Sequence, residues 1–464
     1  MIKNVAIIGG GPAGCALACF LAERSIECMI FDDNKRPALI VGESLIPAAI
    51  PIIRRLGIEQ EIAKFSELKK GAGLRHGSGS PRVDFEFQKS ANGTPDYAYN
   101  IPRAQFDAVL RKRAQTLGVR FIEHRAKVVA TKDNSERDIQ LSDESLAVAG
   151  LSRARQPDLL IDATGRKRLF SKFLGIEADR GPRNDIAHFA HFENYESDSA
   201  IPGQIVISVL DCGWSWQIPL PGRTSVGVVF NNSAAQSYGN TAAERLENVM
   251  QHNPVLSKQG FKRASEVMTY SNYQLLSKRG YGKGWILLGD AFGFVDPMLS
   301  PGVFMSLESA RLLDERVFKN RASTQPQLEL QLDQYVQEMR QWHKAWSFLI
   351  EHFYDGRILT LGEMRPRIDD TTPWYSFGRL ADRFIGGLLS RLISGAGTRS
   401  KFSQAMLTYT CQFMLRNPDK LNNYKVSSDK PKSSTGPSIA EPANTNIAEY
   451  SDEVAKIVAE KVAV

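Results

Sequence analysis

The sequence predicts an α/β protein in which a Rossmann-like domain contains an inserted antiparallel β-sheet domain and is followed by a C-terminal helical region. Three observations lead to this prediction. A glycine-rich turn near the start of the chain joins a β-branched run to a helical pattern. Residues 186–230 alternate apolar and polar side chains, which is typical of an antiparallel sheet with one covered face. After residue 330 the apolar spacing is mostly helical.

Length, composition and charge narrow the class of protein further. With 464 residues and 42% hydrophobic residues, the chain can bury a large core in two or more packed regions. The net charge of +7 is spread without a basic block, so no nucleic-acid-binding module is expected; attraction to an anionic small molecule or an acidic carrier protein stays open. Five cysteines without a CxxC pair, no secretory signal and no long apolar run predict a cytoplasmic protein without a transmembrane segment.

The first thirty-three residues predict a βαβ unit. A strand at 3–9 leads into a helix at 12–24 and a second strand at 28–33. The turn fits GxGxxG, whose glycines make a tight turn, admit a pyrophosphate to the backbone and let helix and strand pack closely. An acid that ends the second strand can accept from a ribose hydroxyl. The candidate cofactor-binding residues here are Gly9, Gly11, Pro12, Ala13, Gly14 and Asp32.

Further along the chain, strand-like and helical segments alternate over long intervals. Residues 119–132 and 138–142 predict a hairpin or meander, 159–165 and 285–290 predict buried strands, and 303–318 predicts a helix. Because the nucleotide-type strands lie far apart, one domain is assembled from separated segments. The predicted parts are the nucleotide-binding segments 1–75, 101–185 and 281–330, the sheet segments 76–100 and 186–280, the helical region 331–426 and a linker-like tail at 427–464.

GWSWQIP, residues 213–219, places two tryptophans one residue apart. Strand alternation puts Trp214 and Trp216 on the same face of their strand, so the two indoles form a flat wall. The alternative is that they only fill a sheet core, as aromatic residues often do.

Three segments resemble the FAD-dependent monooxygenase and halogenase superfamily. IPRAQFDAVL resembles its Arg-x-x-x-Asp helix, DATG (162–165) its second phosphate-side turn, and GDAFGFVDP its Gly-Asp motif. This resemblance implies a Rossmann-like FAD-binding domain of the GR2/PHBH-like type (named for glutathione reductase and para-hydroxybenzoate hydroxylase). It implies Arg103 near the flavin, Asp290 at the ribityl or pyrophosphate region, and a loop beside the isoalloxazine with Pro297, Gly302 and Val303.

Within that superfamily, Trp-x-Trp-x-Ile-Pro resembles the signature of flavin-dependent halogenases. VGESLIP, with Glu43 and Ser44, resembles a cofactor-side segment of the phenol and pyrrole halogenases. The resemblance implies that the indoles keep organic substrates from the flavin, while hypohalous acid travels to a lysine. ELKKGAG aligns Lys69, rather than Lys70, with that lysine. An ammonium there can polarise hypohalous acid, or a buried neutral amine can form a haloamine.

One segment departs from the halogenase pattern. Where halogenases usually have Ser-Ser-Gly or Ser-Thr-Gly, this chain has Ser300, Pro301 and Gly302. Proline has no N–H, so Ser300 and Gly302 are the halide-binding candidates that remain. The departure keeps two alternatives open, an aromatic hydroxylase with a tryptophan wall and an inactive flavin-binding partner in a biosynthetic complex.

The resemblance also implies the reactants and partners. These are FAD reduced by a separate flavin reductase, dioxygen, chloride or bromide, and a phenolic or pyrrolic substrate in secondary metabolism, either free or tethered to an acyl or peptidyl carrier protein. No metal is expected, because His188 and His191 lack Cys or acidic partners in the sequence around them. A basic amphipathic segment at 378–396 is expected to pack on its own domain, and the alternatives are that it lies on a membrane surface or receives an acidic carrier protein. The oligomeric state is left open.

Overall fold

The computed structural model describes residues 2–37, 39–77, 82–89, 94–131, 137–271, 274–363 and 375–414. The predicted tail at 427–464 lies outside these ranges. None of the helices in them is long and apolar enough to cross a membrane.

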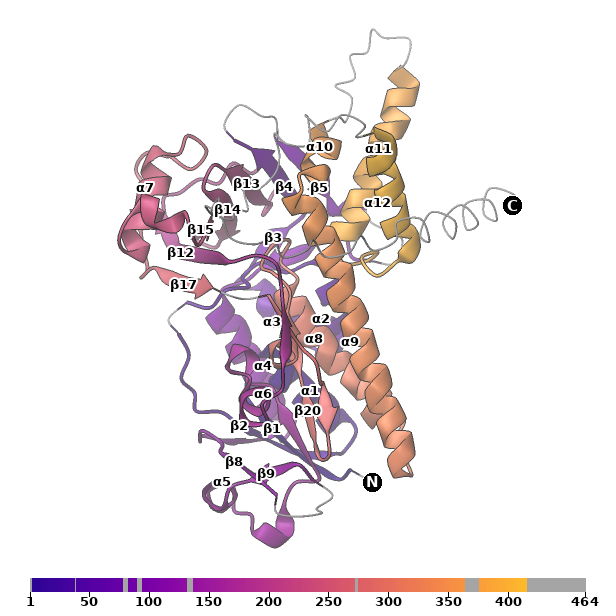
Figure 1. Ribbon diagram of the computed structural model, residues 1–464. Helices are drawn as coiled ribbons and strands as arrows, with labels where there is room; N and C mark the ends of the chain where they lie inside the picture. Colours follow the sequence, from indigo (N-terminus) through magenta and orange to yellow (C-terminus); the bar gives the residue numbers. More distant parts are fainter. Residues whose placement is uncertain are drawn as a thin grey trace, which may run out of the picture.

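A six-stranded sheet forms the first domain (Figure 1). Five strands run parallel, and the edge strand β19 pairs antiparallel with β20. Strands from three distant parts of the chain lie side by side, so the predicted Rossmann-like assembly from separated segments is confirmed. In sheet order the strands are β19 (Tyr281–Gly282), β20 (Trp285–Leu287), β10 (Leu159–Asp162), β1 (Asn4–Ile8), β2 (Glu27–Phe31) and β7 (Arg120–Ile122).

A second, larger sheet forms the inserted domain. It is antiparallel except where β4 runs parallel to β13, and β17 pairs with β12 beside β16. One face packs on α7 (Ala242–His252), and the opposite face carries both tryptophans. In sheet order the strands are β16 (Lys262–Arg263), β12 (Asp185–Glu193), β15 (Arg223–Asn231), β14 (Gly213–Leu220), β13 (Ile205–Leu210), β4 (Gly71–His76) and β5 (Val83–Glu86), with β17 (Met268–Ser271) off this path.

Two predicted elements differ from the structure. Residues 119–132 do not form one strand, because the His124 amide donates to the Ile122 carbonyl and closes a turn after β7. Only β8 (Val128–Ala130) and β9 (Ile139–Leu141) form the hairpin. The helix predicted at 303–318 is α8 (Gly302–Leu313), which continues as one π-helical turn, Asp314–Phe318.

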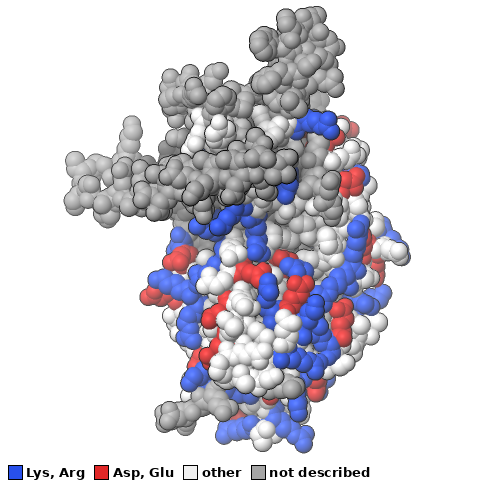
Figure 2. Space-filling model, turned by 90° about the vertical axis from the view of Figure 1, so that its right-hand side faces the viewer, with Lys and Arg blue, Asp and Glu red and all other residues white. Residues whose placement is uncertain are grey.

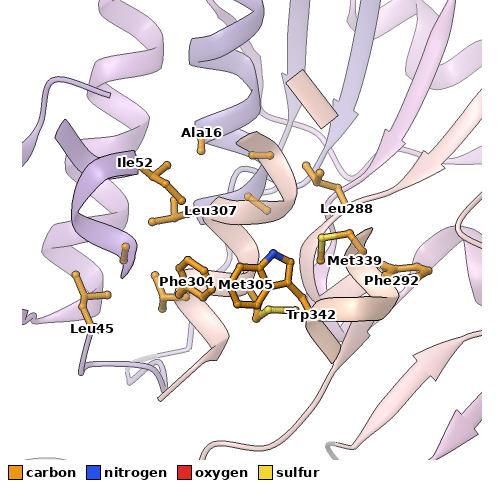
Figure 3. Close-up of a cluster of buried hydrophobic side chains, with 14 of the residues drawn as sticks. Ala16, Leu45, Ile52, Leu288, Phe292, Phe304, Met305, Leu307, Met339 and Trp342 are labelled. Atoms are coloured by element: carbon orange, nitrogen blue, oxygen red, sulfur yellow. The ribbon is translucent and has the colours of Figure 1, made fainter. Parts of the chain in front are cut away.

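The long helix α9 (Gln325–Tyr354) joins the two domains. It begins at Thr324, whose hydroxyl accepts from the Gln327 amide as an N-cap. Figure 3 shows Trp342 of α9 beside Phe304 of α8, and the two rings lie 5.0 Å apart. Figure 1 shows α9 passing from the parallel sheet to the helices beside β4 and β5, which are α10 (Arg357–Glu363), α11 (Tyr375–Ile393) and α12 (Lys401–Met414).

In the described ranges, six further α-helices and two small sheets remain. The remaining helices are α1 (Pro12–Glu23), α2 (Ile50–Arg55), α3 (Glu59–Ala63), α4 (Arg103–Thr116), α5 (Asp143–Val148) and α6 (Leu169–Phe173). Small sheets pair β3 (Glu67–Lys69) with β6 (Ala98–Asn100), and β18 (Leu275–Ser277) with β11 (Ala178–Arg180) and β21 (Gly293–Phe294). On the face in Figure 2, basic and acidic side chains are interspersed, as expected from a charge spread along the chain.

Candidate active site

A cavity of about 1000 Å³ is lined by residues of both domains. Most of the candidate residues named from the sequence line it. Two do not line it: Gly14 lies within α1, and Lys69 lies on β3, outside the lining. Those that line the cavity are Gly9, Gly11, Pro12, Ala13, Asp32, Glu43, Ser44, Arg103, Trp214, Trp216, Asp290, Pro297, Ser300, Gly302 and Val303.

The glycine-rich turn has the shape that a dinucleotide requires. A Cβ on Gly9 would lie 2.3 Å from the Ala163 carbonyl oxygen, and one on Gly14 would lie 2.1 Å from the Gly9 oxygen. These two glycines are therefore needed for the turn and for helix packing. A Cβ on Gly11 would meet nothing within 4 Å, because this glycine borders the cavity. The open backbone at Gly11, at the N-terminus of α1, fits a pyrophosphate group, so the residues present fit a dinucleotide such as FAD.

Asp32 follows the end of β2 and is fixed in place. Its carboxylate accepts from the Gly10 amide at 2.7 Å and from Arg36 Nη2 at 2.6 Å. Sequence reasoning missed Arg36. Its position four residues after Asp32 is the sequence feature that could have indicated this ion pair. Basic side chains border this part of the cavity and suit an anionic cofactor. They are Lys35, Arg36, Arg125, Arg166, Lys167 and Lys172.

Arg103, the first residue of α4, lines the cavity. Its Nε donates to Asp107 Oδ1 at 3.1 Å, and its Nη1 donates to the Val41 carbonyl. Gly42 has φ +97°, and a Cβ there would lie 2.8 Å from Arg103 Nη1, so glycine lets the guanidinium pass. Burial raises the pKa of the nearby Asp290 carboxyl to about 6, against the opposing effect of the Arg103 charge.

The two tryptophans lie side by side on the cavity wall. The Trp214 and Trp216 rings are 5.8 Å apart with planes inclined at 48°, and both side chains are buried. The Trp216 indole lies over Gly227 of the next strand, where a Cβ would be only 2.2 Å from the ring. Trp214 Nε1 donates to the Tyr354 hydroxyl at 3.1 Å. The pair is thus held from the neighbouring strand and from the end of α9.

Tyr354 connects the tryptophan wall to a buried acid. Its hydroxyl donates to Asp296, with both carboxylate oxygens at 3.2 Å. Gln274 Nε2 donates to the same carboxylate at 2.8 Å. Burial raises the pKa of Asp296 to about 7. Sequence reasoning missed Tyr354, because nothing local in its helix indicates a partner 140 residues earlier in the chain.

Lys69 is buried, with 1% of its surface exposed. Its Nζ donates to Ser44 Oγ at 2.8 Å and to the Leu45 carbonyl at 2.9 Å. Burial lowers the pKa of Lys69 to about 7, so a large share of the amine is neutral at neutral pH. Lys70, in contrast, is part-exposed and pairs with Asp96 at 3.3 Å.

The loop before α8 presents a helix N-terminus to the cavity. Leu299 and Ser300 adopt left-handed conformations with φ +63° and +61°. The Ser300 amide donates to the Pro297 carbonyl at 3.0 Å, which leaves its hydroxyl as the donor it can offer a ligand. Pro301 is the N-cap residue of α8, so Gly302 is in the first turn and its amide has no partner within the helix. This amide, the Ser300 hydroxyl and the positive end of the helix dipole are together suited to an anion.

The two histidines of β12 lie on opposite faces of their strand. His188 Nδ1 and Thr269 Oγ1 are 2.9 Å apart, whereas His191 Nε2 lies 2.7 Å from Glu43 Oε1 on the cavity side. Within the ranges that the structure describes, no group of three or more Cys, His, Asp or Glu side chains is placed to hold a metal.

A family model described as tryptophan halogenase matches residues 80–357, which is more than half of the chain. The chain belongs to the tryptophan halogenase family. A second model, described as an NAD(P)-binding Rossmann-like domain, matches residues 7–41. The predicted halogenase membership, the FAD cofactor and the oxidoreductase class are therefore confirmed for this halogenase, whereas the roles of individual residues stay predictions.

Curated relatives agree with this membership, and solved structures share the fold. The chain is 29% identical over 398 residues to a 1H-pyrrole-2-carbonyl-[peptidyl-carrier protein] chlorinase of Pseudomonas fluorescens, covering 77% of this chain and 84% of that protein. It is 27% identical over 361 residues to a tryptophan 2-halogenase of Chondromyces crocatus, covering 76% and 68%. The flavin-dependent brominase Bmp2 has the same fold, with TM-score 0.70, 20% identity and 90% and 100% coverage. So does the myxobacterial chondrochloren halogenase CndH, with TM-score 0.66, 22% identity and 89% and 97% coverage.

Proposed function

We propose that this halogenase oxidises chloride or bromide to hypohalous acid and transfers the halogen, as an electrophile, to a phenolic or pyrrolic ring. Reduced FAD, delivered by a separate reductase, would supply the two electrons with which dioxygen and halide give hypohalous acid and water. The chain binds the cofactor through the glycine turn, Asp32 and the basic side chains around it. Trp214 and Trp216 keep ring-bearing molecules out of the cofactor part of the cavity.

The observation that carries the proposal is the buried Lys69. Its pKa of about 7 provides neutral amine, which can take up halogen, together with ammonium, which can hydrogen-bond hypohalous acid. Ser44 lines the cavity and accepts from Lys69, so this hydroxyl connects the amine to the space where hypohalous acid forms. Lys69 would then pass the halogen to the substrate ring.

A carrier-tethered substrate is the finer part of the proposal. Its support is the similarity to a chlorinase whose name specifies a pyrrole-2-carbonyl group on a peptidyl carrier protein. The net charge of +7 also favours encounter with an acidic carrier. A matched pair of substrates, the free acid and its carrier-bound thioester, tests this part on its own.

The second candidate is hydroxylation of an aromatic substrate, which Pro301 favours because its ring nitrogen cannot donate to a halide. The third, a flavin-binding partner without catalysis, predicts FAD binding and no oxygen-dependent product. Turnover with reductase, NADH, FAD and bromide, followed by mass spectrometry, separates all three. The bromine isotope pattern supports halogenation, and a gain of one oxygen supports hydroxylation.

Two lysine variants sharpen this test. Lys69→Ala is expected to abolish brominated product while flavin oxidation continues, and Lys70→Ala, its neighbour on the surface, is expected to leave product formation near wild type. Brominated product from Lys69→Ala at the wild-type rate would show that Lys69 is not the relay.

A further inference from the structure

A buried carboxylate and a buried imidazole meet at the cavity wall from segments 148 residues apart. Glu43 Oε1 lies 2.7 Å from His191 Nε2, and the side chains are 4% and 5% exposed. Glu43 lines the cavity, and His191 lies on the same face of β12 as Phe189, which lines it too. In the part of the chain that the structure describes, His191 is the side chain that bonds the Glu43 carboxylate.

The main chain fixes both partners. The Glu43 carbonyl accepts from the Ile101 amide at 2.6 Å. His191 donates its amide to Ser265 Oγ at 2.9 Å, and its carbonyl accepts from the Ala264 amide at 2.8 Å. With both backbones held, the 2.7 Å contact fixes where the carboxylate points.

Charge explains why such a contact is needed. Flavin phosphates and a halide are anionic, and an uncompensated carboxylate on the same wall would repel both. Arg103, the neighbouring cation, is already paired with Asp107. His191 is therefore the group placed to donate a hydrogen bond to the Glu43 carboxylate and compensate its charge.

We propose that His191 is a positioning residue that neutralises the Glu43 carboxylate and orients it along the cofactor cavity. The proposal rests on the proposed function only in that the cavity binds FAD. A test by binding and redox measurements needs no product, so its failure is distinct from a failure to halogenate.

The experiment measures the dissociation constant of oxidised FAD and the midpoint potential of bound FAD. Three single variants are compared: His191→Leu, His191→Gln and Glu43→Gln. His188→Leu is the matched control, because His188 is an equally buried histidine of the same strand that faces away from the cavity. The double variant of Glu43→Gln with His191→Leu completes a thermodynamic cycle.

His191→Leu is expected to weaken FAD binding by about tenfold and to lower the midpoint potential, because negative charge disfavours the more anionic reduced flavin. His191→Gln, which keeps a donor but carries no charge, is expected to restore part of the affinity and to leave the midpoint potential lowered. In the Glu43→Gln background, His191→Leu should change neither quantity. Should the leucine variant fail to fold, His191→Met, which also has no donor, completes the same cycle. An additive cycle, or equal losses in His191→Leu and His188→Leu, would overturn the proposal.

Discussion

The Lys69 amine donates a hydrogen bond to the Ser44 hydroxyl, with Nζ and Oγ 2.8 Å apart. Ser44 lines the cavity and Lys69 does not. Ser44 therefore connects the buried amine to the cavity. Among the described residues, Ser44 Oγ and the Leu45 carbonyl are the two hydrogen-bond acceptors of the buried Lys69 amine, and no acidic side chain pairs with it.

The stability of the protein should depend on pH through Lys69. Between pH 7 and about 10.5, folded Lys69 is mostly neutral while unfolded Lys69 is protonated, so this residue makes stability rise with pH. The five buried cysteines, whose thiol pKa burial raises, contribute in the opposite direction in every variant. Lys69→Met should remove this rise, which amounts to at most about 1.4 kcal/mol per pH unit. Urea unfolding at pH 7, 8 and 9 measures the slope. Lys70→Met, at a part-exposed site, is the control and should keep it.

Alanine substitutions at Gly11 and Gly14 should have different effects, the first on FAD affinity and the second on the free energy of unfolding. Gly11→Ala fills open space next to the cavity, so FAD affinity should fall at least about tenfold while the free energy of unfolding changes by less than about 0.5 kcal/mol. Gly14→Ala forces a Cβ against the Gly9 oxygen and should cost about 1–3 kcal/mol. Fluorescence titration with FAD and denaturant unfolding of both variants provide the comparison. A stable Gly14→Ala protein would contradict the packing argument.

The position of the Trp216 indole should depend on Gly227. Gly227→Ala places a methyl group 2.2 Å from the ring and should destabilise the protein by about 1–3 kcal/mol. Trp216→Phe in the same background introduces a smaller ring and should recover part of that loss. The two substitutions should therefore be non-additive in thermal or urea unfolding. Simple additivity would mean that the ring does not occupy this space.

Two substitutions of Ser300, which has a left-handed conformation, should distinguish the effect of backbone strain on stability from the effect of its hydroxyl on halide affinity. Ser300→Gly relieves a φ of +61° and should raise stability by about 1 kcal/mol, while loss of the hydroxyl raises the KM for bromide. Ser300→Ala loses the hydroxyl and keeps the strain, so it should raise the KM without the gain in stability. An unchanged KM in both variants would remove Ser300 from the halide site.

Much of the fold could be predicted because its signals are local. The spacing Gly9, Gly11, Gly14 next to a strand specifies the turn, and the period of two residues puts Trp214 and Trp216 on one face. The parallel pairing of β4 with β13 was not predicted, because the register between strands more than 120 residues apart leaves no local pattern.

The candidate site was predictable in its motifs and not in its contacts. A resemblance aligned Lys69, but its place behind Ser44 depends on how β3 packs under the segment 43–45. His191 was considered only as a metal ligand from its spacing to His188, because its true partner, Glu43, comes from a distant segment. Buried polar pairs of this kind form by tertiary packing, which periodicity does not report.

The reach of α9 limits how this enzyme can be recombined with its relatives. Near its middle, Trp342 packs against α8 beside the nucleotide fold, and its last residue, Tyr354, holds both an indole and a buried acid. A chimaera that exchanges the C-terminal helices should therefore place its junction after residue 354. The contacts of Tyr354 with Trp214 and Asp296 are then kept.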